Sequence, residues 1–522
     1  MANTISCSDV KALMDSEELY ALFDIREQGE YNERQIYRAT SLPRRQIEFR
    51  LPDLVSNVNV PIIVYDEGGR RGALAAATIE QMGYPVRILA GGLPAWADAG
   101  YPTVSGVNVP SKEFGERVSH DDRVPEMGPE ELHRRIERGD KLSLIDVRTP
   151  GEFGRFCIPG AINIPGGNLI LWAEALRSPL DSTIIINCAG RTRSIVGTAS
   201  LRRLGLTNVY ALKNGTMGWL LAGLELEHNP GRLTPPVTPE SCERASFFAQ
   251  RVAKEENIPL LAVADLIELQ RNLTGEMFYL IDVRAETEYG VGHIAGSLNV
   301  PGGQAVQRAD DVVAVRNARI IFVSNRADRA TMAAYWYARM GFSRVAILQG
   351  GLKAWQEHGQ ETKHGLWDRA PFGYETVCET TKFMSATELQ CLLSLRRITV
   401  LDVSTSVEFE SSHIAGARWL SRGWLELKFP ALFPDRRQAI VVVCPNGHHS
   451  VLAARTLMEL GYTEVSVLEG GFQSWKDQNL PLESGSDGCL MQPNDLVLSP
   501  SIKGDREAMK RYLEWEINLR KE

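Results

Sequence analysis

The sequence predicts four tandem α/β domains, each a small parallel sheet flanked by helices. Its length of 522 residues exceeds what a single hydrophobic core supports. One pattern of strands and turns recurs four times along the chain, and strand-like segments alternate with helix-like segments in every copy. That alternation is typical of parallel sheets covered by helices. We therefore place domains at 1–105, 125–228, 259–360 and 383–484, followed by a helical tail over 485–522.

Each repeat opens with an apolar strand that ends at an aspartate. The four strands are Leu22-Phe-Asp24, Leu144-Ile-Asp146, Leu280-Ile-Asp282 and Val400-Leu-Asp402. A glutamate followed by an aromatic residue comes next in every copy: Glu30-Tyr31, Glu152-Phe153, Glu288-Tyr289 and Glu408-Phe409. Chance does not hold such a register through four copies, so the repeat itself is secure.

A second apolar strand ends just before one position that differs between the repeats. At the same distance from each aspartate, the four copies have Asp66, Cys188, Ser324 and Cys444. Ligands of open parallel sheets bind at the loops that follow the carboxyl ends of the strands. This position is therefore the candidate site of every repeat.

A third strand in each repeat leads to a glycine-containing turn and a tryptophan. The tryptophans are Trp96, Trp219, Trp355 and Trp475. They recur whatever residue occupies the candidate site, so we interpret them as core packing. Linkers are expected at 106–124, 229–258 and 361–382, with a helix from Ala245 to Glu256 in the middle one.

The overall composition excludes several classes of protein. A net charge of −8 provides no basic surface for nucleic acid or anionic membrane. The apolar runs are too short to cross a bilayer, and the segment Met1–Val10 does not look like a secretory signal. The eight cysteines are scattered, without the paired spacing of a zinc site. We expect a cytoplasmic protein with reduced thiols and no metal.

The second repeat resembles the rhodanese family of sulfurtransferases. The resemblance rests on Asp146-Val-Arg148, on Ile158-Pro-Gly-Ala-Ile-Asn-Ile-Pro165, on the loop Cys188-Ala-Gly-Arg-Thr-Arg-Ser194, and on the closing Asn214-Gly-Thr-Met-Gly-Trp219. It covers nearly the whole chain, once per repeat. It implies a small five-stranded domain in each copy and transfer of sulfane sulfur through a cysteine persulfide, without any other cofactor.

The Cys188 loop has the residue types that such chemistry needs. Sulfur transfer requires a thiolate, and a cysteine before a helix faces backbone N–H groups and the positive end of the helix dipole. Gly190 allows a tight loop, and Arg191 and Arg193 supply positive charge for an anionic donor. The expected substrate-binding residues are Ala189, Gly190, Arg191, Thr192, Arg193 and Ser194.

Three further residues of this repeat call for a structural interpretation. Asp146 and Arg148 are expected to form an ion pair that orients the loop, not a catalytic pair. Cys157 stands where the third and fourth repeats have His293 and His413. A packing role is favoured for Cys157 over that of a resolving thiol, because buried cysteines are common.

The other three loops depart from the Cys188 pattern. The loop of Cys444 has Gly447 and His449 in place of the arginines, although His448 and His449 could become charged at mildly acidic pH. The sequence leaves open whether Cys444 is a relic or a second site. Ser324 cannot form a persulfide and has no apparent general base, and Asp66 would repel an anionic donor, so repeats 1 and 3 are predicted to be inactive.

Two functions from different classes remain open. The first is an enzyme that moves sulfur from thiosulfate or a persulfide to cyanide or a thiol through Cys188. The second is a sulfur-relay or scaffold protein that docks partner proteins, among them a sulfur acceptor. A phosphatase or arsenate reductase is disfavoured, because the related loops of those enzymes are one residue longer between cysteine and arginine.

Overall fold

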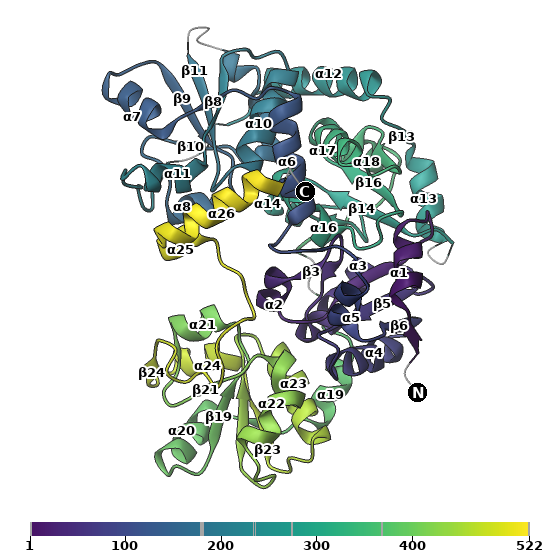
Figure 1. Cartoon of the computed structure of the whole chain (residues 1–522), viewed down its shortest axis with the longest axis vertical. Helices are drawn as coiled ribbons and strands as arrows, with labels where there is room; N and C mark the ends of the chain where they lie inside the picture. Colours follow the sequence, from purple (N-terminus) through teal and green to yellow (C-terminus); the bar gives the residue numbers. More distant parts are fainter. Residues whose placement is uncertain are drawn as a thin grey trace. The chain divides into compact units, whose positions relative to one another are not determined.

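The computed structural model confirms four α/β domains, each with its own five-stranded parallel sheet (Figure 1). It describes residues 3–177, 182–232, 234, 236–272, 275–366 and 369–519. The undescribed residues include Leu233 and Pro235 of the middle linker and the last three residues of the predicted tail. Among the described residues, no helix has both the length and the apolar character needed to cross a membrane.

The chain divides into two compact units, and the repeats are paired 1 with 4 and 2 with 3. Unit 1 comprises Met1–Ser16, Ala21–Val107 and Asp368–Val497, and unit 2 comprises Glu17–Tyr20, Asn108–Trp367 and Leu498–Glu522. The last segment of the chain therefore belongs to the unit of repeats 2 and 3, although it follows repeat 4 in sequence.

Repeat 1 has the strand order β1-β6-β5-β2-β4. Its elements are β1 (Thr4–Ile5), α1 (Cys7–Met14), β2 (Ala21–Asp24), α2 (Gln28–Glu33), β3 (Gln35–Ile36), β4 (Thr40–Ser41), α3 (Ile47–Leu54), β5 (Ile62–Tyr65), α4 (Arg71–Gln81), β6 (Val86–Leu89), α5 (Gly92–Asp98) and β7 (Thr103–Val104). The short strands β3 and β7 pair outside the main sheet.

Repeat 2 has the equivalent order β8-β12-β11-β9-β10 and is preceded by helix α6 (Val109–Asp121). Its elements are β8 (Glu126–Met127), α7 (Pro129–Glu137), β9 (Leu142–Asp146), α8 (Pro150–Arg155), β10 (Ile162–Asn163), α9 (Leu169–Trp172), β11 (Thr183–Asn187), α10 (Thr192–Arg203), β12 (Val209–Leu212) and α11 (Gly215–Leu221). Every residue of β11 is buried, as expected for a central strand covered on both faces.

Repeat 3 repeats this order as β13-β17-β16-β14-β15 and is preceded by α12 (Pro239–Glu255). Its elements are β13 (Leu260–Leu261), α13 (Val263–Arg271), β14 (Phe278–Asp282), α14 (Glu286–Val291), β15 (Leu298–Asn299), α15 (Gly302–Gln307), α16 (Ala309–Val312), β16 (Arg319–Val323), α17 (Asp328–Arg339), β17 (Val345–Leu348) and α18 (Gly351–Glu357). Helix α12 begins at Pro239, earlier than predicted, with its N-terminus capped by Thr238, and packs on α9 and α17.

Repeat 4 has the order β18-β23-β22-β19-β21 and is preceded by α19 (Tyr374–Thr380). Its elements are β18 (Phe383–Met384), α20 (Ala386–Ser394), β19 (Thr399–Asp402), α21 (Ser406–Ser411), β20 (His413–Ile414), β21 (Arg418–Trp419), α22 (Leu425–Leu432), β22 (Ile440–Val443), α23 (His448–Glu459), β23 (Val465–Leu468), α24 (Gly471–Asp477) and β24 (Leu482–Glu483). The tail contains α25 (Pro500–Lys503) and α26 (Arg506–Asn518). The helical part of the tail, expected from about Ser501, begins at Pro500.

The four recurring tryptophans are core residues, as predicted. Each is buried, and each indole nitrogen donates a hydrogen bond to a backbone carbonyl of the segment that follows its helix. Cys157 is likewise buried in the core of repeat 2, and burial raises the pKa of its thiol to about 11. This environment is consistent with packing, because an activated thiol needs a lowered pKa.

Candidate functional site

The four candidate positions lie at equivalent points, directly after the central strand of each main sheet. Asp66 follows β5, Cys188 follows β11, Ser324 follows β16 and Cys444 follows β22, and each precedes the next helix. Each loop is closed by the turn before the tryptophan helix, where a backbone N–H donates to the carbonyl of the candidate residue. In repeat 2 this bond joins Thr216 N to Cys188 O at 2.9 Å.

The loop of repeat 1 shows what kind of group this position holds. The Asp66 carboxylate accepts hydrogen bonds from the backbone N–H groups of Gly68 at 2.7 Å, Gly69 at 3.2 Å and Gly72 at 2.7 Å. Converging backbone N–H groups form an anion-binding nest. In this fold the loop is therefore a cradle for negative charge, which Asp66 fills with its own side chain.

Cys188 occupies the same position in repeat 2 and is only 2% exposed. Its Sγ lies 3.4 Å from the Ser194 hydroxyl. Burial raises the pKa of the thiol, while Arg193 and the side chain and backbone of Ser194 act to lower it. The sequence led us to expect a loop that favours the thiolate. The structure has those favourable groups, but burial outweighs them in this conformation.

Arg193 acts electrostatically on the Cys188 thiol, and its guanidinium is held by an ion pair that the sequence did not reveal. Its guanidinium forms two hydrogen bonds with Glu152, at 2.7 and 2.8 Å. Burial tends to raise the pKa of Glu152, but Arg193 lowers it to about 2. The equivalent pairs Arg71–Glu30 and Arg329–Glu288 recur in repeats 1 and 3. The pair is thus a structural feature of the repeat, and in repeat 2 its cation also faces Cys188.

Arg191, by contrast, has no equivalent in the other repeats. Its guanidinium pairs with Glu116 of α6 at 2.9 Å and with Glu126 of β8 at 3.0 Å. At this position repeats 3 and 4 have Ala327 and Gly447 in left-handed conformation, with φ of 66° and 87°. Both arginines that we expected to bind substrate are therefore already paired with carboxylates of the protein.

The remaining predicted loop residues lie around the thiol. The carbonyl of Ala189 accepts hydrogen bonds from Thr216 and Met217. A Cβ on Gly190 would lie 3.4 Å from the Met217 methyl, so a larger residue there would crowd α11. Thr192 is the first residue of α10.

Asp146 and Arg148 form the buried ion pair that the sequence predicts. Arg148 Nη2 lies 2.7 Å from Asp146 Oδ2 and donates a second bond to the carbonyl of Phe156. Asn187, just before Cys188, donates to the same carboxylate at 3.1 Å. Equivalent pairs exist in repeats 1 and 3, and Ser404 replaces the arginine in repeat 4. The pair therefore connects the ends of the two central strands beneath the loop.

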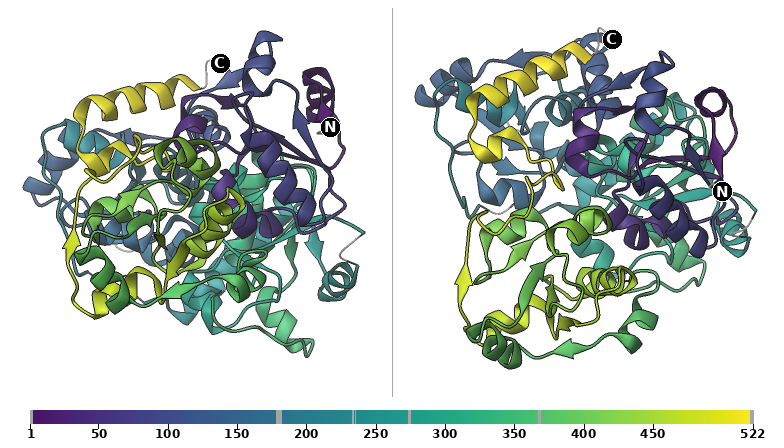
Figure 2. Two further views of the ribbon diagram at one scale, coloured as in Figure 1. Left: turned by 90° about the horizontal axis from the view of Figure 1, so that it is seen from below. Right: turned by 60° about the horizontal axis from the view of Figure 1, so that its bottom comes forward.

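The site also has a roof that sequence reasoning missed. Helix α26 lies beside α11 of repeat 2 and beside α6, as Figure 1 shows, and Figure 2 shows the same yellow helix from two other sides. Met509 and Leu513 of α26 are buried against Met217 of α11. The four-residue spacing of this apolar pair predicts an amphipathic helix. No sequence signal identifies the surface that the helix covers.

The Cys444 loop has the same thiol and serine but different neighbours. Cys444 Sγ lies 3.4 Å from the Ser450 hydroxyl, and burial raises the pKa of the thiol. His449, expected to gain charge at mildly acidic pH, stacks on Phe49 at 4.2 Å. Burial and the nearby Arg422 and Arg45 lower its pKa to about 2. That expectation is wrong for His449, because the imidazole is partly buried beside two cations.

The Ser324 loop contains an acidic partner that we did not expect. The Ser324 hydroxyl donates to Asp328 Oδ1 at 3.1 Å and accepts from the backbone N–H of Ala330 at 3.2 Å. The prediction that no base accompanies Ser324 is therefore wrong, since the Asp328 carboxylate accepts its hydrogen bond. The hydroxyl remains unable to carry sulfur as a persulfide.

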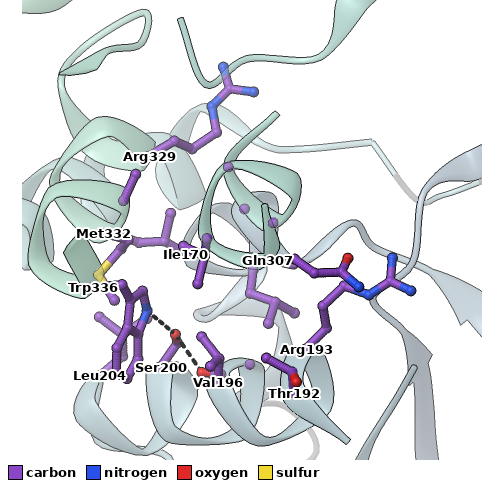
Figure 3. A pocket seen from close by; sticks show the side chains of 18 residues that line it. Ile170, Thr192, Arg193, Val196, Ser200, Leu204, Gln307, Arg329, Met332 and Trp336 are labelled. Carbon is purple, nitrogen blue, oxygen red and sulfur yellow. Dashed lines mark hydrogen bonds between the residues drawn. The ribbon is translucent and has the colours of Figure 1, made fainter. Parts of the chain in front are cut away.

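A narrow cavity of about 40 Å³ lies between repeats 2 and 3 (Figure 3). Trp336 of α17 donates a hydrogen bond to Ser200 of α10 at 3.1 Å on its wall. Arg193 and Arg329 lie at its rim. A space of this size holds about one water molecule, so we interpret it as a packing seam between two equivalent domains.

Comparisons with known proteins agree with this geometry. A family model described as the rhodanese-like domain matches residues 6–99, 128–222, 265–358 and 385–478. The crystal structure of a thiosulfate sulfurtransferase from Pseudomonas aeruginosa is 33% identical in sequence. It superposes with a TM-score of 0.91 over 99% of this chain and 97% of that one. The similarity therefore extends over all four repeats.

Two shorter relatives match about one repeat each. A sulfurtransferase from Allochromatium vinosum is 29% identical over 103 residues, which are 20% of this chain and 94% of that protein. The thiosulfate sulfurtransferase GlpE from Coxiella burnetii is 35% identical over 95 residues, which are 18% of this chain and 87% of that protein. A single repeat thus corresponds to an entire small protein.

Proposed function

The chain belongs to the rhodanese family of sulfurtransferases, and on that premise we propose that it moves sulfane sulfur through a persulfide on Cys188. The observation that carries this proposal is the Cys188 loop itself. It combines a thiol, a serine hydroxyl 3.4 Å away and a buried arginine at the position equivalent to Asp66, whose carboxylate is held by backbone N–H groups. The other three repeats lack this combination, since they have Asp66, Ser324 or a Cys444 loop without arginine.

In the first step, the Cys188 thiolate attacks the outer sulfur of the donor. With thiosulfate, a new S–S bond forms, the bond between the two donor sulfurs breaks, and sulfite leaves with the bonding electron pair. With a persulfide R–S–SH, the thiol R–SH takes the place of sulfite as the leaving group. The backbone N–H groups of the loop and the charge of Arg193 stabilise the anionic persulfide that results.

In the second step, a nucleophilic acceptor removes the outer sulfur. Cyanide attacks that sulfur, thiocyanate leaves, and the electron pair of the broken S–S bond returns to Cys188 as thiolate. A thiol acceptor gives a new persulfide in the same way. The protein ends the cycle unchanged, so it needs no oxidant or reductant.

The charges of the loop arginines are held in place by carboxylates of the protein. Glu152 orients Arg193, and Glu116 and Glu126 orient Arg191. Such pairs fix cations without reorganisation during the reaction. We therefore assign Arg193 to stabilisation of the thiolate and persulfide, and Arg191 to the shape of the loop.

A relay function remains the second candidate, because Cys188 is almost fully buried. A donor or acceptor protein that displaces part of the roof would gain access that a small molecule lacks. Repeats 1 and 3 would then serve as docking domains. This function predicts saturable transfer of sulfur to a protein acceptor together with weak turnover of cyanide.

The direct test is the mass of the intact protein after treatment with a sulfur donor. Wild type is expected to gain one sulfur atom, and digestion is expected to locate it on the peptide that contains Cys188. Cys188→Ser is expected to gain none at that peptide. A wild type that gains no sulfur from thiosulfate or from any persulfide would overturn the proposal.

A further inference from the structure

The roof of the Cys188 loop places a second carboxylate over the anion cradle. Glu516 of α26 is 1% exposed, and its Oε1 accepts a hydrogen bond from the Thr192 hydroxyl at 2.8 Å. Thr192 begins α10, so the carboxylate lies at the positive end of this helix. The Glu516 carboxylate therefore occupies a position at the start of α10, beside the Cys188 loop, that favours an anion.

The other oxygen of this carboxylate is turned toward the loop. A Cβ on Gly190 would lie 3.2 Å from Glu516 Oε2 and 3.5 Å from the Tyr512 ring. Among the described residues, Oε2 is buried without a hydrogen bond of good geometry, although the Tyr512 side chain interacts with this carboxylate. A buried carboxylate oxygen without a partner is costly. The negative charge of this oxygen therefore acts on any group that binds at the Cys188 loop.

The surroundings of Glu516 balance its charge only in part. The ammonium group of Lys112 lies 5.0 Å from the Tyr512 ring centre and 4.8 Å from that of Trp515, so α6 brings one cation to this helix. Burial has the largest effect and raises the pKa of Glu516, and Glu116 acts in the same direction, while Lys112, the Thr192 hydrogen bond and Arg191 act to lower it. Glu516 in turn disfavours the Cys188 thiolate. The carboxylate and the reacting sulfur are thus electrostatically coupled.

We propose that Glu516 is a specificity-determining residue that makes the Cys188 site prefer a persulfide over thiosulfate as sulfur donor. Thiosulfate carries two negative charges on a small ion, and its binding at the Cys188 loop would bring both charges toward the Glu516 carboxylate. The persulfide of an amino thiol or of a protein cysteine brings at most one charge at its reacting sulfurs. Repulsion between like charges in a partly desolvated site therefore penalises thiosulfate more strongly. This inference rests on the proposed function, since it names the donor class of that same site.

The test compares two donors in the full-length protein, with cyanide as acceptor. Kinetic constants are measured for thiosulfate and for cysteine persulfide in wild type, Glu516→Gln and Glu514→Gln. Glutamine keeps the size and the Thr192 hydrogen bond while removing the charge. Glu514 is an exposed residue of the same helix and serves as the matched control.

Glu516→Gln is expected to raise kcat/KM for thiosulfate by about tenfold or more, with a much smaller change for cysteine persulfide. Glu514→Gln is expected to leave both values as in wild type. Thermal unfolding checks that each variant is folded, and Glu516→Ala replaces Glu516→Gln if the latter is not.

Two outcomes separate this inference from the function on which it rests. If wild type turns over a donor but the charge-removing variant leaves the ratio of the two kcat/KM values unchanged, the role of Glu516 is overturned and the Cys188 chemistry stands. If wild type acquires sulfur from neither donor, the proposed function itself fails, and the inference fails with it.

Discussion

The loops of Cys188 and Cys444 hold the same nucleophile next to the same hydroxyl, in different electrostatic surroundings. In both, the cysteine sulfur lies 3.4 Å from a serine hydroxyl at the start of the following helix. Near Cys188 the third group is the guanidinium of Arg193, whereas the equivalent position of the Cys444 loop holds His449, whose lowered pKa leaves it uncharged. A buried cysteine and its serine are therefore a property of the loop, and the cation is what distinguishes the two.

Replacing each cysteine in turn is the strongest test of the difference between the two loops. Cys188→Ser is expected to lower thiocyanate production from thiosulfate and cyanide by at least about a thousandfold, because a hydroxyl cannot carry the sulfur. Cys444→Ser is expected to leave the rate near that of wild type. Activity that survives the first change and disappears with the second would move the chemistry to the fourth repeat.

Replacing Arg193 tests whether its charge distinguishes the Cys188 loop. Repeat 3 provides a control, because it has the same ion pair without a cysteine. Arg193 acts to lower the pKa of Cys188, so Arg193→Met is expected to raise that pKa further. The thiolate fraction at neutral pH, and with it turnover, would then fall about tenfold. The pH profile of Cys188 alkylation measures the shift, which is expected toward higher pH.

Arg329→Met is the matched control for that experiment. It leaves Glu288 without its partner, as Arg193→Met leaves Glu152. Both changes are expected to lower the free energy of unfolding by about 1–2 kcal/mol, a value reduced for the partial exposure of the glutamates. An equal loss of turnover in both variants would mean that the cation acts through stability alone.

The cradle itself can be tested in repeat 1. Asp66→Asn is expected to lower the free energy of unfolding by about 1–3 kcal/mol, because the amide cannot accept all three backbone N–H bonds of the carboxylate. Urea unfolding measures this loss, and Asp98→Asn, at an exposed position, is the control. Unchanged stability in Asp66→Asn would contradict the assignment of this loop as an anion nest.

The smallest expected effect concerns the two serines. Ser194→Ala removes a hydroxyl that favours the Cys188 thiolate and is expected to reduce turnover a few-fold, equivalent to about 0.5–1 kcal/mol. Ser450→Ala removes the equivalent group from the Cys444 loop and is expected to leave turnover unaltered. A decrease with Ser450→Ala would show that the fourth repeat takes part in the reaction.

The fold was predictable because each repeat carries its own local signals. The strands that end at Asp146 and just before Cys188 lie as expected, and the same register holds in all four repeats. The apolar strands, glycine turns and buried tryptophan of one repeat all occur within about a hundred residues of sequence. Four copies of the pattern made each single assignment stronger.

The site was predictable only as far as its own loop. Glu116 and Glu516 come from helices outside the repeat, and their contacts with Arg191 and Thr192 join segments far apart in sequence. His449 was misjudged for the same reason, since the Phe49 ring that buries it belongs to repeat 1. A loop motif reports which groups are present, whereas their charge states depend on what the rest of the chain places against them.

The Asp66 carboxylate has a consequence for how the repeats respond to small anions. A protein is stabilised by a ligand only where a vacant site binds it in the folded state. Repeat 1 is permanently saturated, because its ligand is part of its own covalent structure. The stability of repeat 1 should therefore not depend on the concentration of sulfite or thiosulfate. A rise in the melting temperature of this protein that comes from an anion binding at a candidate loop then reports on its other repeats.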